Sequence, residues 1–157
     1  ALAGYAGAPM AWWWDRYLHP RKLYGIYDGL SRFVAEVPPE FFDLPPMAEK
    51  TESKPPLSIR GLKGPGGAAL WVRPEENRWQ RLLQEGEREV LLPAGHLTLK
   101  RMDAGSYAFR WFDIAKGRFL EAGGAAAAKN GDLALPLPEG LPDAAVIVKP
   151  AAKGAGR

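Results

Sequence analysis

The N-terminal part of the chain changes its apolar spacing after Pro20. Residues 9–14 form a short run that is apolar at every position, which is typical of a strand buried on both faces, as in a parallel sheet. After Pro20, apolar residues recur three and four positions apart, so we predict an amphipathic helix of about four turns that ends before Pro38. The apolar stripe of this helix comprises Leu23, Ile26, Tyr27, Leu30, Phe33 and Val34.

Residues 1–37 therefore supply one strand and one helix. A parallel strand needs hydrogen-bonding partners on both sides, and this region offers none, so we interpret it as a piece of a larger sheet. Residues 38–56 carry six prolines and a pair of phenylalanines, Phe41 and Phe42. This composition predicts an extended connector, pinned by its aromatic residues, at a domain boundary.

Residues 57–150 alternate short period-two runs with turn residues. We predict about seven strands in an antiparallel β-sandwich, so the fold class is mainly β. Tyr107, Phe109 and Trp111 share one face of such a run, as core residues do. A hairpin turn follows them, with Gly117 where positive φ is needed.

Two further segments of this region lack strand alternation. The low-complexity residues 123–128 are predicted to be a loop. The alternating glutamates Glu85, Glu87 and Glu89 are interpreted as a solvated hairpin and not as a metal site. Residues 151–157 form a tail with nothing to pack.

Composition narrows the classes of function. The 157 residues suit one domain, or one domain with a fragment of another. The net charge of +3 comes from scattered lysines and arginines, which argues against a nucleic-acid partner. The chain has no cysteine, and its two histidines, His19 and His96, are far apart. We therefore expect no metal and no cofactor.

The apolar start of the chain does not predict a targeting segment. No basic residue precedes it, whereas a signal peptide begins with one. It ends at Asp15, short of the roughly 20 apolar residues that a membrane span needs. We expect neither a signal peptide, nor a transmembrane segment, nor a membrane partner for the given chain, and the compartment stays open.

Several motifs occur in an order that resembles one enzyme family. Residues 4–15 end in Trp12-Trp13-Trp14-Asp15 and are followed by Tyr17-Leu18-His19-Pro20. Together with residues 69–73, 77–79 and 104–113, they resemble the C-terminal end of cellulase-like (β/α)8 glycoside hydrolases. The likeness runs through the last barrel strand and helix to the appended β-sandwich, sometimes labelled a collagen-binding domain. It covers nearly the whole chain in order.

The resemblance implies a carbohydrate site at the end of the barrel strand. Trp14, Asp15, Tyr17 and Trp12 would line one wall of a sugar cleft. Core packing is the favoured interpretation of Trp12 and an equal alternative for Trp14, and a turn or a helix cap is the favoured interpretation of Asp15.

The resemblance does not supply a catalyst. The family's two catalytic carboxylates come from earlier strands, about 5–5.5 Å apart in retaining enzymes, and those strands are missing. The acidic residues of the barrel-like segment are Asp15 and Asp28. We predict no catalytic residue, and we expect the isolated chain to be inactive.

Three functions follow as hypotheses. The first is the accessory C-terminal portion of a glycoside-hydrolase-like protein, which braces the barrel and needs the missing barrel portion or a partner subunit. The second is an autonomous carbohydrate-binding module using Trp71, Trp79 and Trp111, although a core position is the favoured interpretation of these residues. The third is a structural subunit that docks through residues 1–37.

Overall fold

The computed structural model describes residues 19–22, 24–78, 80–128 and 130–151. The strand predicted in residues 9–14 lies outside the described residues, so the barrel-end unit stays a prediction. The elements in chain order are α1 (Gly25–Glu36), the 3-10 helix η2 (Pro39–Asp43), β1 (Pro46–Lys50), β2 (Leu57–Gly64), β3 (Gly67–Pro74), the short π-helix η3 (Gln80–Gln84), β4 (His96–Leu99), β5 (Gly105–Asp113), β6 (Arg118–Ala128), β7 (Leu133–Pro136) and β8 (Ala144–Pro150).

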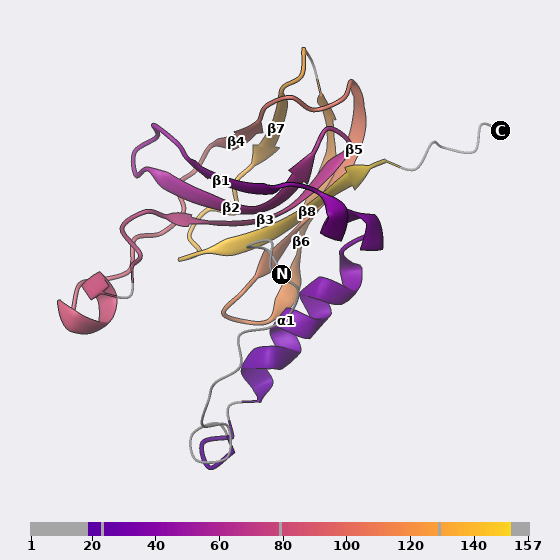
Figure 1. The fold of residues 1–157 in the computed structure, drawn as a ribbon. Helices are drawn as coiled ribbons and strands as arrows, with labels where there is room; N and C mark the ends of the chain where they lie inside the picture. Colours follow the sequence, from indigo (N-terminus) through magenta and orange to yellow (C-terminus); the bar gives the residue numbers. More distant parts are fainter. Residues whose placement is uncertain (1–18, 23, 79, 129, 152–157) are drawn as a thin grey trace.

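The strands form two antiparallel sheets. The large sheet has six strands in the order β1-β2-β3-β8-β5-β6, and the small sheet pairs β4 with β7. In Figure 1, α1 lies on one side of the large sheet, and β4 and β7 lie on the other. The predictions of a mainly β class and of antiparallel strands are confirmed. No helix in the described residues is long and apolar enough to cross a membrane.

The main core lies between the two sheets. Alternate residues of the large sheet face it, because side chains along a strand point to opposite faces in turn. The predicted core face of Tyr107, Phe109 and Trp111 is confirmed: all three are buried. The indole Nε1 of Trp111 also donates a hydrogen bond of 2.9 Å to the carbonyl of Pro136 in β7. Trp111 therefore links the two sheets.

The outer face of the large sheet, the side that α1 occupies, carries a second apolar cluster. Phe33 of α1 packs edge-on to Phe112 of β5, with ring centroids 5.5 Å apart. Phe112 in turn meets Phe119 of β6 at 4.9 Å. Phe41 of η2 lies so close to Gly67 that a Cβ there would come within 2.3 Å of its ring. Only glycine at position 67 admits this contact.

The predicted helix is confirmed, with two differences. It begins at Gly25 rather than soon after Pro20. Its apolar stripe is only partly covered, because Phe33 is buried while Leu30 remains 39% exposed. The backbones of Gly29 in α1 and Gly117 approach closely: a Cβ on Gly29 would lie 3.1 Å from the Gly117 Cα. Gly117 has the predicted positive φ, at 60°.

Residues 123–128 were wrongly predicted as a loop. They belong to β6, which pairs with β5 from Gly105 opposite Ala128 onward. Glycine and alanine have weak strand propensity, but the ladder to β5 overrides it. Gly124 also leaves room for the ring of Phe109 across the pair, since a Cβ at this position would lie 3.3 Å from that ring.

Residues 38–56 are more than an extended connector. They contribute η2 and the edge strand β1, and Phe41 is buried while Phe42 is 46% exposed. The domain boundary itself stays a prediction. The hairpin expected around Glu85–Glu89 is also absent, because these residues have no strand pairing in the structure. They belong to residues 75–78 and 80–91, here called the arm, which projects from the large sheet (Figure 1).

Trp111→Ala is expected to lower the free energy of unfolding by about 3–5 kcal/mol, because it leaves a cavity and removes the bond to Pro136. Urea denaturation followed by circular dichroism measures this change. Leu83→Ala is the control: Leu83 is 81% exposed, so its effect should stay within about 0.5 kcal/mol. Equal effects of the two variants would contradict the core position of Trp111.

Candidate functional site

In the described part of the chain, α1 covers only part of the outer face of the large sheet. The tight turn between Gly64 and Gly67 sets the register of β2 and β3, in which Arg60 lies opposite Trp71 and Ser58 opposite Arg73. Directly opposed residues of an antiparallel pair have Cβ atoms about 4.5–5.5 Å apart. Arg60 and Trp71 are therefore neighbours on the outer face. Arg60 is exposed and Trp71 is partly exposed.

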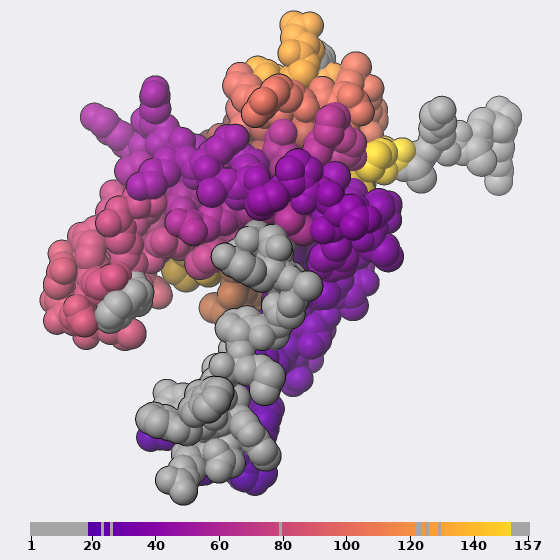
Figure 2. Space-filling model, viewed as in Figure 1, coloured from indigo at the N-terminus to yellow at the C-terminus, as the bar shows by residue number. Residues whose placement is uncertain are grey.

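A groove of about 890 Å³ lies at this position. We call it the Trp71 groove. Its floor comes from β2 and β3, and the arm supplies the facing wall. In Figure 2 the arm projects from the sheet and leaves a hollow between itself and the body of the molecule. The lining residues are Lys50, Arg60, Trp71, Arg73, Glu75, Asn77, Arg78, Gln80, Leu82, Leu83, Glu87 and Glu89.

The indole of Trp71 is held in a defined orientation. Its Nε1 donates a hydrogen bond of 3.0 Å to Oδ2 of Asp143, which directly precedes β8. The guanidinium of Arg73 lies 5.5 Å from the ring centroid, within the range of a cation–π contact. The orientation of the indole is therefore determined before any ligand arrives.

Asn77 fastens the arm to the sheet. Its Nδ2 donates hydrogen bonds of 2.8 Å to the carbonyls of Val90 and Pro142, and its Oδ1 accepts one of 2.9 Å from the Val90 amide. Arg73 donates to the Asn77 carbonyl as well. These bonds join both ends of the arm to the loop that carries Asp143, so the groove wall and the Trp71 partner are positioned together.

Glu75 acts as an anchor for two cations. Its carboxylate pairs with Lys50 at 2.8 Å and with Arg78. The hydrogen bond from Lys50 lowers the pKa of Glu75, and the bond from Arg78 adds to this effect, against a smaller opposing effect of burial. Glu75 therefore stays ionised and orders the groove wall, so it is unsuited to donate a proton.

Asp143 has the opposite tendency. Burial raises the pKa of Asp143, and the negative charges of Glu89 and Asp113 raise it further. The hydrogen bond from Trp71 and the charge of Arg73 act in the other direction. A carboxyl group in this environment can accept hydrogen bonds from a bound ligand beside the indole.

A second pocket, of about 830 Å³, adjoins the first. We call it the helix pocket, because it lies between α1 and the outer face. It is more apolar than the Trp71 groove, with Tyr27, Leu30, Phe33 and Ile114 among its lining residues. Trp71 lines both pockets, so the indole stands between the polar and the apolar parts of this face.

The residues predicted as carbohydrate-binding, Trp12, Trp14, Asp15 and Tyr17, lie outside the described residues, as does Trp79. Asp28 lines the helix pocket, and His19 forms a 3.2 Å hydrogen bond with the hydroxyl of Tyr24. Within the described part of the chain, no group of three or more His, Cys, Asp or Glu side chains could hold a metal ion.

Trp71 was wrongly favoured as a core residue. It belongs to neither buried cluster, whereas its neighbours Leu70 and Val72 are fully buried. A sequence signal for this existed. Leu70 and Val72 alternate with Trp71 and Arg73, and an arginine on the tryptophan's side indicates a face that solvent reaches.

Comparison with family models, curated proteins and solved structures gives no significant match. The resemblance to glycoside hydrolases therefore stays a prediction, and the case for function depends on the geometry of the Trp71 groove.

Asp143→Asn tests the raised pKa of Asp143. Because this pKa lies above its ordinary value of 3.8, the folded wild type holds the proton more tightly than the unfolded chain. Its stability therefore falls as pH rises from 3.8 through the folded pKa. The asparagine keeps an acceptor for Trp71 but carries no charge. The stability of the variant relative to wild type should rise across this interval in urea denaturation at successive pH values.

The control for this experiment is Glu121→Gln. Glu121 is exposed on β6 and is not one of the charges that shift Asp143. It should show little of the pH-dependent gain. A flat difference between Asp143→Asn and wild type would contradict the burial of this carboxyl group.

Proposed function

We propose that this chain is the accessory C-terminal portion of a glycoside-hydrolase-like protein, and that its β-sandwich binds carbohydrate in the Trp71 groove. The observation that carries the proposal is the placement of a partly exposed, hydrogen-bonded indole on the open outer face of the sheet. In this proposal the catalytic carboxylates belong to barrel strands elsewhere, and the sandwich contributes binding and support.

The chemistry of the Trp71 groove suits a sugar. A pyranose has an apolar CH face that packs on an aromatic plane, and hydroxyls around its edge that need hydrogen-bond partners. Trp71 supplies the aromatic surface. Donors and acceptors lie on both sides of it: Arg60 on β2 and Asp143 before β8.

The groove is also arranged in advance. Trp71 is bonded to Asp143, and Asn77 joins the arm to the loop before β8. A ligand that meets side chains already in position loses less conformational entropy on binding. This smaller entropy loss matters for a sugar, because its individual contacts with a protein are weak.

Two carboxylates of the groove, Glu75 and Glu87, are held by basic side chains and support the shape of the site. Glu75 is held in ion pairs with Lys50 and Arg78, and Glu87 pairs with Arg81. Hydrolysis of a glycosidic bond needs one carboxyl group that can donate a proton and a second that can act as nucleophile or base. The ion pairs of Glu75 keep it ionised, so it is unsuited to the proton-donating role.

Trp71→Ala should weaken binding of the preferred polysaccharide at least about tenfold, because the aromatic surface is lost. Affinity gel electrophoresis with a panel of soluble neutral and acidic polysaccharides identifies that ligand, and isothermal titration with its oligosaccharides measures the change. Trp71→Phe keeps an aromatic ring without the bond to Asp143, so it should fall between wild type and Trp71→Ala.

Phe42→Ala is the matched control. It also removes an exposed aromatic ring, but from η2, and Phe42 does not line the Trp71 groove. It should bind as wild type does. If no polysaccharide binds, or if the two alanine variants lose affinity equally, the Trp71 groove is not a sugar site.

A second candidate function is a docking subunit. The observation that favours it is the exposure of Tyr24, Leu30 and Ile114, at 44%, 39% and 40%. Leu30 and Ile114 also line the helix pocket, and clustered exposed apolar residues mark interfaces. In the accessory-domain proposal the same surface would brace the missing barrel.

Leu30→Glu tests the docking function, because a charge at an exposed helical position blocks an apolar interface with little cost to folding. Light scattering coupled to size exclusion should show association of the wild-type chain as its concentration rises, and the variant should remain monomeric. A wild-type chain that stays monomeric at every concentration would count against the docking function.

A further inference from the structure

We infer that the Trp71 groove selects an anionic glycan, and that Arg60 binds the carboxylate or sulfate of that glycan. This inference depends on the proposed carbohydrate-binding function and specifies its ligand class. It is carried by the arrangement of charges in the groove and by the position of Arg60 beside the indole.

The residues that line the Trp71 groove include one more cation than carboxylates, and Asp143 lies outside this lining, in the helix pocket. Four basic residues line it, namely Lys50, Arg60, Arg73 and Arg78, against three acidic residues, namely Glu75, Glu87 and Glu89. A groove with a cationic excess attracts anions over a distance set by salt. The question is which cation is available to a ligand.

Three of the four cations already have partners. Lys50 and Arg78 both pair with Glu75. Arg73 donates to the carbonyls of Pro74 and Asn77 and lies near the ring of Trp71. Lys50, Arg73 and Arg78 therefore stabilise the walls of the groove. A ligand that bound through them would break their contacts with Glu75 and Asn77.

Arg60 is the cation that remains. It is exposed, and among the described residues it forms no hydrogen bond or ion pair. Arginine presents a planar fork of donors that matches a carboxylate or a sulfate in a bidentate way, which a lysine does not. An unpaired fork at the floor of the groove is therefore suited to an anionic group of the ligand.

The order of the strands predicts how the ligand is oriented on the indole of Trp71. Trp71 is on β3, with Arg60 on β2 to one side and Asp143, before β8, on the other. A sugar ring packed on the indole would place its anionic group toward β2. Its hydroxyls would donate to Asp143 on the opposite side. The reversed orientation would bring the anion toward Asp143 and Glu89, whose charges already oppose each other.

The experiment compares each anionic polymer with a neutral counterpart of the same backbone. Polygalacturonate and its methyl ester differ in a carboxylate, and dextran sulfate and dextran differ in a sulfate. At about 0.1 M salt, where distant charges are screened, wild type should bind the anionic member of at least one pair about tenfold more tightly than the neutral member. The pair that shows the preference identifies carboxylate or sulfate as the recognised group.

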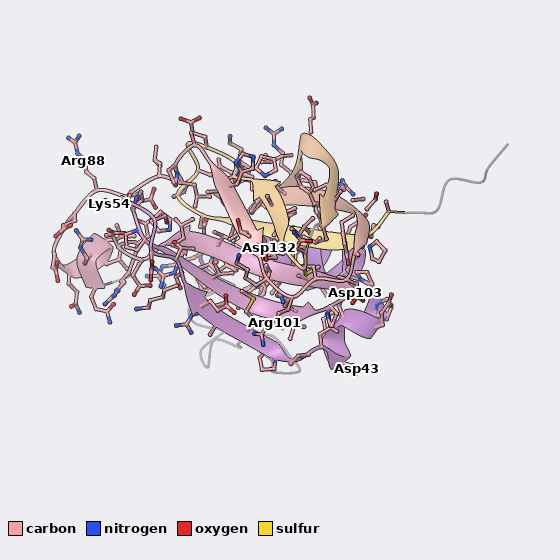
Figure 3. The ribbon with its side chains drawn as sticks, turned by 90° about the horizontal axis from the view of Figure 1, so that it is seen from above. Asp43, Lys54, Arg88, Arg101, Asp103 and Asp132 are labelled. Carbon is pink, nitrogen blue, oxygen red and sulfur yellow. The ribbon has the colours of Figure 1, made fainter. Side chains whose placement is uncertain are left out.

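Arg60→Gln should remove this preference, because it should lower the affinity for the anionic polymer about tenfold more than the affinity for its neutral counterpart. Arg60→Lys, which keeps the charge but not the fork, should retain only part of it. Arg88→Gln is the matched control. It removes one positive charge from the arm, but Arg88 does not line the Trp71 groove, and Figure 3 shows its side chain pointing away from the ribbon. It should keep the full preference.

Three outcomes would overturn the inference. If wild type binds neutral and anionic polymers equally, the groove does not select charge, and the proposed sugar site alone survives. If Arg60→Gln and Arg88→Gln lose the preference equally, the selectivity comes from net charge and not from Arg60. If no polymer of either kind binds, the inference fails together with the proposed function.

Discussion

Strands β3, β8 and β5 are buried on both faces over much of their length, and the positions of the other elements follow from what covers each face. Toward the inner face they present Leu70, Val146 and Trp111, which the small sheet covers. Toward the outer face they present residues such as Ile147 and Phe112, which α1 and η2 cover. Apolar surface removed from water on two sides of one sheet provides the main favourable term in the stability of this chain.

α1 and η2 cover only part of the outer face of the large sheet, and the candidate site lies in the part that they leave uncovered. Phe33 of α1 and the following residue Val37 pack on the sheet, and the described helices leave a pocket over the part of the outer face near Trp71. A sheet face that solvent reaches is ordinarily polar, as the exposed Arg60 is. The indole of Trp71 is the exception: Asp143 accepts a hydrogen bond from its Nε1, and the guanidinium of Arg73 lies 5.5 Å from its ring centroid. An apolar plane ringed by hydrogen-bonding groups is what a sugar ring requires.

The arm gives the groove a facing wall without adding strands to the sheet. Its short π-helix is exposed, so packing contributes little to holding it in place. Instead, Asn77 and Glu75 hold the arm through hydrogen bonds and ion pairs to segments on both sides of it. Because these hydrogen bonds and ion pairs hold the arm near its ends, the residues that line the Trp71 groove stay accessible. An apolar contact between the arm and the sheet would have closed the groove.

The sequence alone determined most of the strands and one side of the core. The alternation of apolar and polar residues within a strand is a local property, and it does not depend on which strands pair with one another. It also located the turn at Gly117, since positive φ restricts residue type within the turn itself. It could have indicated the partly exposed position of Trp71, because arginines share its face. Only the tertiary structure decided that residues 123–128 form part of β6, and that β8 inserts between β3 and β5. Both features depend on which strands pair across long stretches of the chain. The insertion of β8 beside β3 also brings Asp143 within hydrogen-bonding distance of Trp71, which lies 72 residues earlier in the chain.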